Sequence, residues 1–136
     1  MRARTAYLAE LIGLYTILIP LTMFVNKATM VAAVTAFPQS PAAMVLAGVC
    51  ALGVGLAIVL GHNVWSGGAL PIVVTVVGWL SLLKGLVLLG LPPDSAAAYF
   101  VALQYAQYVY VYAAITLILG LYLTYGGFAA AKRANR

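Results

Sequence analysis

Four apolar stretches, each about 20 residues long or longer, dominate this sequence. They are Tyr7–Val25, Pro41–Leu60, Ala69–Leu91 and Tyr99–Phe128. An α-helix needs about 20 apolar residues to cross the hydrocarbon core of a bilayer, so each stretch predicts a transmembrane helix. We therefore expect an all-α fold, an integral membrane four-helix bundle that forms one transmembrane domain over residues 1–136.

The composition excludes a soluble domain of this size. Hydrophobic residues make up 65% of the chain and charged residues 7%, whereas soluble domains are about 45–50% apolar and about 25% charged. A small soluble domain has too little interior to bury so much apolar surface. A lipid bilayer is therefore the expected surrounding and the first expected partner.

Short breaking segments separate the four stretches. The first connection begins at Asn26-Lys27, the second contains Gly61-His62-Asn63, and the third is Pro92-Pro93-Asp94-Ser95. Within the first connection, segment 28–37 is apolar but too short to span a bilayer. It predicts a short helix lying at the membrane interface.

The Lys and Arg residues are concentrated at the two ends of the chain. Arg2 and Arg4 precede the first stretch, and three more basic residues follow the fourth. The positive-inside rule and the even number of spans predict a multi-pass protein with both termini cytoplasmic. The second connection should then also be cytoplasmic, although it contains no Lys or Arg.

Two other interpretations of the basic residues are less favoured. The net charge of +5 comes without a basic stripe or interleaved aromatic residues, so nucleic acid is not an expected partner. A cleaved secretory signal would need a shorter apolar run and a small-residue cleavage site, and Glu10 interrupts this run.

Ionisable and amide side chains within apolar helices are the candidate functional residues, because burying them in a membrane is costly. Glu10, His62 and Asn63 are expected at one level near the cytoplasmic side. Lys84 lies about 10 Å from the outer end of its helix, at the rise of an α-helix, and Gln104 is expected at a similar depth. The sequence therefore predicts that Glu10 and Lys84 do not pair.

Each candidate has a functional and a structural interpretation. Glu10 with His62 could form a proton or cation site, or Glu10 could be a carboxylate favoured by the dipole of the first helical turn. Lys84 could bind an anion or a lipid headgroup, or could bond to Gln104, Tyr108 or a carbonyl. Trp65, in the second connection, is expected to anchor the chain at the interface.

The fourth stretch places tyrosines at helical spacing. Tyr105, Tyr108 and Tyr112 are three and four residues apart, so they should share one face with Gln104 beside it. Such a face could line a polar cavity, but hydroxyls bonded across helices are the favoured interpretation.

Small residues four apart in the second stretch predict close helix packing, within the chain or between copies. One row is Ala47, Ala51 and Gly55, and the other is Gly53, Ala57 and Gly61.

No pattern in the sequence indicates a cofactor, a metal site or an enzyme. One histidine and one cysteine, Cys50, cannot supply the ligands of a zinc or bis-histidine haem site. Nucleotide-binding glycine motifs and Ser-His-Asp sets are also missing from the sequence.

Several motifs together resemble a group of small bacterial four-helix membrane proteins of unknown function. They are Gly61–Gly68, Val77-Gly78-Trp79-Leu80 with Lys84-Gly85, and Leu91-Pro92-Pro93. The resemblance implies a bacterial inner-membrane protein and carries no activity with it.

Three functional hypotheses follow. The favoured one is a non-enzymatic accessory or structural subunit, which forms a homo-oligomer or joins a larger membrane complex. The alternative is an oligomeric small transporter or channel that uses Glu10, His62 or Lys84. A membrane enzyme acting on lipid or quinone is the least favoured.

Overall fold

The computed structural model describes residues 2–134, in which helices are the only regular secondary structure. Side chains are described for these residues except 2, 93, 96, 97, 99, 100, 105, 106, 133 and 134. The four long helices are α1 (Arg2–Val25), α3 (Pro41–Gly61), α4 (Ala69–Gly90) and α6 (Tyr105–Ala134). The shorter ones are α2 (Lys27–Ala36), the 3-10 helix η1 (Phe37–Gln39) and α5 (Pro93–Ala102).

The prediction of four long apolar helices is confirmed. Each long helix contains a segment that is long and apolar enough to cross a membrane. These segments are Ala3–Val25, Pro41–Gly61, Ala69–Gly90 and Gln107–Lys132. The short helix expected over 28–37 corresponds to α2, which has no buried residue, and to the first residue of η1.

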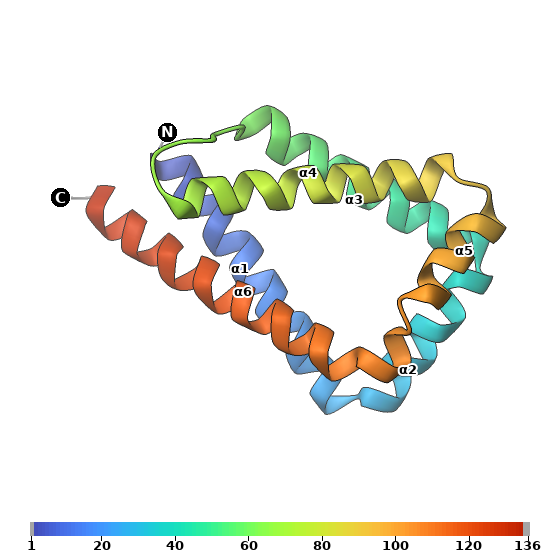
Figure 1. Ribbon diagram of the computed structural model, residues 1–136. Helices are drawn as coiled ribbons and strands as arrows, with labels where there is room; N and C mark the ends of the chain where they lie inside the picture. Colours follow the sequence, from blue (N-terminus) through green and yellow to red (C-terminus); the bar gives the residue numbers. More distant parts are fainter. Residues whose placement is uncertain (1, 135–136) are drawn as a thin grey trace.

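The helices are arranged as two antiparallel pairs, α1 with α6 and α3 with α4 (Figure 1). The pairs meet at the end of the molecule where α1 begins, α6 ends and α3 connects to α4, and they diverge toward the other end. There α2 contacts α6, and η1 contacts α5. The expected four-helix bundle is therefore a splayed structure whose open side is closed by α2, η1 and α5 (Figure 1).

A small buried residue recurs every seven positions in each long helix. The members are Ala6, Gly13 and Pro20 in α1, Gly48 and Gly55 in α3, Gly78 and Gly85 in α4, and Ala113, Gly120 and Gly127 in α6. Seven-residue spacing keeps these positions facing the partner helix along a left-handed supercoil. Both pairs therefore use the same packing pattern.

The glycines bring the helices of each pair close together. A Cβ atom added at Gly55 would lie 2.6 Å from the Cα of Leu82, and one at Gly85 would lie 2.7 Å from the Cα of Leu52. In the other pair, a Cβ at Gly13 would meet backbone and side-chain atoms of Thr124. Any larger residue at these positions would push the two backbones apart.

One core cluster joins the two pairs at the end where they meet. It is formed by the buried side chains of Ala9, Ile58, Val74 and Leu123, one from each long helix. Among the described core clusters, this is the one to which all four long helices contribute. Polar residues next to it in the sequence, such as Glu10 and Thr75, are therefore held where the two pairs meet.

The fourth span differs from its predicted bounds. The run expected to be continuous over 99–128 is interrupted between α5 and α6, where Gln104 has a left-handed φ of 45°. Tyr108 has non-helical angles inside α6, and the apolar segment long enough to span runs from Gln107 to Lys132. The hydroxyl of Tyr112 donates to the carbonyl of Leu103 at 3.0 Å, which satisfies a backbone group at the interruption.

Candidate functional site

The connection between α3 and α4 is held in place by one buried hydroxyl. Thr75 is fully buried in α4, and its Oγ1 accepts a hydrogen bond from the backbone N–H of Val64 at 3.0 Å. The same oxygen lies 3.0 Å from the carbonyls of Val64 and Pro71 and 3.3 Å from that of His62. Since a hydroxyl has one hydrogen to donate, these three carbonyls share it.

His62 follows the last residue of α3 and is enclosed by the fold. It is 3% exposed, and its backbone N–H donates to the carbonyl of Ile58 at 2.6 Å. The ring nitrogen Nε2 is buried and has no hydrogen-bond partner. An unsatisfied buried polar atom costs about 1–3 kcal/mol, so this nitrogen is a costly polar feature at this end of the molecule.

Glu10 lies on α1 beside Ala9 of the core cluster, and its side chain is half-buried. A Cβ added at Gly127 would lie 2.7 Å from the Cγ of Glu10, so the glutamate packs over the backbone of α6. The hydroxyl of Thr124, one turn earlier in α6, is buried and has no hydrogen-bond partner. Gly127 therefore provides the space that lets the carboxylate stem lie between the helices of this pair.

Glu10 and His62 occupy the same end of the molecule. Glu10 adjoins Ala9, and His62 follows Ile58 by one helical turn, with both Ala9 and Ile58 in the core cluster. The Nε2 atom of His62 does not bond to Glu10, because it has no partner. The structure thus brings the two side chains to one level without joining them through this nitrogen.

Asn63 and Trp65 form a local contact on the surface of the same connection. The indole Nε1–H of Trp65 donates to Oδ1 of Asn63 at 2.7 Å, and both side chains are exposed. Asn63 therefore bonds to Trp65 within the same connection, and neither side chain is buried.

Lys84, Gln104 and Tyr108 are placed apart from this end. Lys84 is exposed on α4 beside Gly85, and no hydrogen bond from it to Gln104 or Tyr108 is found in the described part of the chain. Gln104 lies in the interruption before α6, and Tyr108 is 44% exposed at the kink within it. The side chain of Tyr105 lies outside the described residues.

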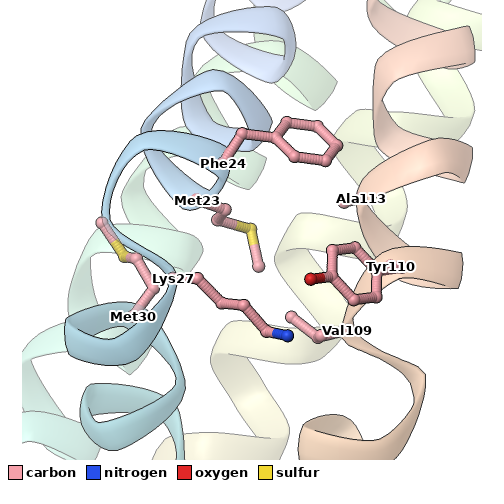
Figure 2. Close-up of a pocket in the computed structure, with 7 residues that line it drawn as sticks. All are labelled: Met23, Phe24, Lys27, Met30, Val109, Tyr110 and Ala113. Carbon is pink, nitrogen blue, oxygen red and sulfur yellow. The ribbon is translucent and has the colours of Figure 1, made fainter.

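A contact that the sequence interpretation missed ties α2 to α6. The Nζ atom of Lys27 lies 4.5 Å from the centroid of the Tyr110 ring, and Phe24 stacks on the same ring at 6.3 Å. Figure 2 shows these side chains with Met23 and Met30 around a small pocket whose volume of about 10 Å³ has room for about one water molecule. Local sequence does not indicate this contact, because Lys27 and Tyr110 are 83 positions apart and only the tertiary fold brings them together.

The residues described above do not assemble a metal site. Among the described residues, no three His, Cys, Asp or Glu side chains lie close enough to hold a metal ion. Cys50 is exposed near the middle of α3, away from Glu10 and His62 at the end where the pairs meet.

No protein-family model matches this chain, and comparisons with curated proteins and with solved structures find no match. The resemblance to small bacterial four-helix membrane proteins therefore stays a prediction.

Proposed function

We propose that the chain is a multi-pass protein of the bacterial inner membrane, with both termini cytoplasmic, and that it serves as a non-enzymatic accessory or structural subunit. It would bind other membrane proteins or further copies of itself.

The observation that carries this proposal is the large uncovered apolar surface of the four long helices. In each potential membrane span, only 22–28% of an 18-residue apolar stretch is buried within the chain. Exposed apolar surface of this extent is stable against lipid tails or against another apolar protein surface. A helix pair that packs tightly inside and is apolar outside is suited to assembly within a bilayer.

The exposed face of α3 supports the assembly role. Gly53, Ala57 and Gly61 are all exposed, and a Cβ at either glycine would meet nothing within 4 Å. The other predicted row, Ala47, Ala51 and Gly55, is not open in this way, because its Gly55 packs against Leu82 of α4. The part of this row at Gly53 would let a helix of a second protein approach closely.

The proposed orientation is supported by the arrangement of charges. Arg4 and Lys132 are exposed at the end where α3 connects to α4, whereas Lys27 and Asp94 belong to the opposite end (Figure 1). The second connection needs no Lys or Arg of its own, because the ends of α1 and α6 carry positive charge at the same end of the molecule.

The test is to purify the chain from native membranes in a mild detergent and to measure the mass of the particle together with any protein that co-purifies. A subunit should be found in a complex of fixed stoichiometry, well above the 14.2 kDa of one chain plus its detergent. A monomer without a partner, active on its own in transport or turnover, would contradict the proposal.

The second candidate function is an oligomeric transporter, and the buried Nε2 of His62 without a partner is the observation that favours it. Because Lys84 faces outward, it could line a pathway only between copies of the chain. Glu10→Gln and His62→Gln would abolish flux in a transporter that still inserts. In a subunit the same changes would alter only assembly or stability.

A further inference from the structure

A groove lies between α1 and α3 at the end where the helix pairs meet. Its volume is about 410 Å³, within the range of about 300–1,000 Å³ that is usual for small-molecule sites. The groove is lined by Ala3, Arg4, Tyr7 and Leu8 of α1 and by Ala57 and Gly61 of α3. Four of these six residues are apolar or have no side chain, so the groove is apolar with one cationic and one phenolic group.

The lining residues are ordered along the helix axes. Arg4 lies near the start of α1 and Gly61 is the last residue of α3, so both belong to the outer end of the groove. Leu8 and Ala57 lie one turn further in, about 6 Å deeper at the rise of an α-helix. The groove thus begins beside a guanidinium group and continues between apolar walls.

The groove is open because the residues on its α3 side are small. Nothing lies within 4 Å of a Cβ added at Gly61, and Ala57 is exposed. Leu8, on the α1 side, packs against the core cluster, which fixes this wall of the groove. A flexible chain of methylene groups could lie in the groove and cover the exposed apolar surface of both walls.

The charge of the groove favours an anion at its outer end. Arg4 is exposed, and none of the described residues that line the groove is acidic. Glu10, the nearest carboxylate along α1, packs instead over Gly127 of α6. A guanidinium group matches the oxygens of a phosphate and can bind two of them at once. The Tyr7 hydroxyl, one turn further along α1, can add a hydrogen bond.

We propose that this groove binds one anionic phospholipid of the cytoplasmic leaflet. Its phosphate lies on Arg4, and an acyl chain follows Leu8 and Ala57 between the helices. The inference rests on the proposed membrane position and orientation of the chain, because these put Arg4 at the level of the headgroups.

The test is native mass spectrometry of the purified protein with dioleoyl phosphatidylglycerol or dioleoyl phosphatidylcholine, which have the same acyl chains. We expect one phosphatidylglycerol to be retained in preference to phosphatidylcholine. Arg4→Gln should weaken its binding on the order of fivefold, since one basic residue near an anionic surface contributes about 1 kcal/mol. Gly61→Leu should remove the bound lipid by filling the groove.

Two matched variants control for general effects. Lys132→Gln removes the same charge from the same end but does not line the groove, and Gly53→Leu adds the same bulk to an exposed position of α3 outside it. Both should keep the bound lipid. Equal loss with Arg4→Gln and Lys132→Gln, or equal binding of the two lipids, would overturn the inference. The inference would also be overturned if Gly61→Leu displaced a protein partner or a second copy of the chain instead of a lipid.

Alkaline carbonate extraction of membranes separates this inference from the proposed function. If the wild-type chain is extracted as a peripheral protein, the membrane proposal fails and the lipid inference fails with it. If the chain stays in the membrane but shows no preference for phosphatidylglycerol, the lipid inference alone is wrong.

Discussion

The close packing of α3 on α4 makes Gly55→Ala the most informative substitution. A methyl group at this position would lie 2.6 Å from the Cα of Leu82, whereas ordinary contact begins near 3.4 Å. The backbone nitrogen of Leu82 would be closer still, so the two backbones must separate by about 1.1 Å. A gap of about 0.5–1 Å removes roughly a quarter to a half of the dispersion energy of the affected contacts.

Gly53→Ala is the matched control for this substitution. Gly53 lies on the same helix, and a Cβ there would meet nothing within 4 Å. Both changes gain the helix propensity of Ala over Gly, about 0.8–1 kcal/mol. The difference between the two variants isolates the cost of separating the helices, for which overpacking predicts about 1–3 kcal/mol.

The assay is reversible unfolding in mixed micelles with increasing SDS, followed by far-ultraviolet circular dichroism. We expect Gly55→Ala to unfold at lower SDS than the wild type, and Gly53→Ala to unfold at an equal or slightly higher concentration. If the unfolding free energies of the two variants agree within about 0.5 kcal/mol, the close approach of α3 to α4 does not exist.

Three further predictions follow from particular contacts. Thr75→Val should destabilise the protein by about 1–3 kcal/mol and expose the connection at Val64 to protease, because it leaves the partly buried N–H of Val64 unpaired. Thr75→Ser should restore both the stability and the protection, and equal behaviour of the two variants would contradict the role of the hydroxyl. Lys27→Met should cost about 0.5–1 kcal/mol of unfolding free energy through loss of the cation–π contact with Tyr110, with Lys27→Arg close to the wild type. Trp65→Phe should leave the unfolding free energy within about 0.5 kcal/mol of the wild type, because the indole is exposed and bonds only to an exposed side chain; a larger loss would place Trp65 in a contact that the structure does not contain.

The long helices could be predicted because apolar length is a strong signal. The second and third predicted spans begin at Pro41 and Ala69, where α3 and α4 begin. Proline can open a helix, and glycine before Ala69 has a left-handed φ, so both boundaries are visible in the sequence.

The interruption at Gln104 could not be predicted in the same way. No Gly or Pro lies between Leu103 and Tyr108 to indicate it, and a left-handed residue other than glycine costs about 1–2 kcal/mol. The tertiary contacts of α5 with η1 and of α2 with α6 accompany the interruption, and local sequence does not contain them. Gln104, expected beside the tyrosine face, lies in this interruption and outside α6.

The packing glycines recur in the sequence at a spacing of seven residues and not at the four-residue spacing of the predicted rows. Rows with a spacing of four residues identified Gly55, but they also selected Gly53 and Gly61, which are exposed. A spacing of seven residues selects Gly48 with Gly55 in α3, both of them buried. The seven-residue pattern was informative because positions seven residues apart stay against the partner helix when two helices supercoil.

The candidate site was predictable in position but not in its contacts. Glu10 and His62 share one end of the molecule, as expected from their distances to the helix ends. Thr75 was missed because a threonine in an apolar helix has no sequence feature that reveals its partners. Those partners belong to a connection that begins 13 residues earlier, so only the tertiary fold brings them together.

The most direct test of the membrane arrangement is cysteine labelling from one side of the membrane. In a Cys50→Ser background, Thr29→Cys, Ser66→Cys and Ser95→Cys each place one thiol at an exposed position in a different connection. A membrane-impermeant maleimide should label positions 29 and 95 in intact spheroplasts, and position 66 only after permeabilisation. Labelling of position 66 from outside would reverse the proposed orientation, and equal labelling of positions 66 and 95 would show that α4 does not cross the membrane.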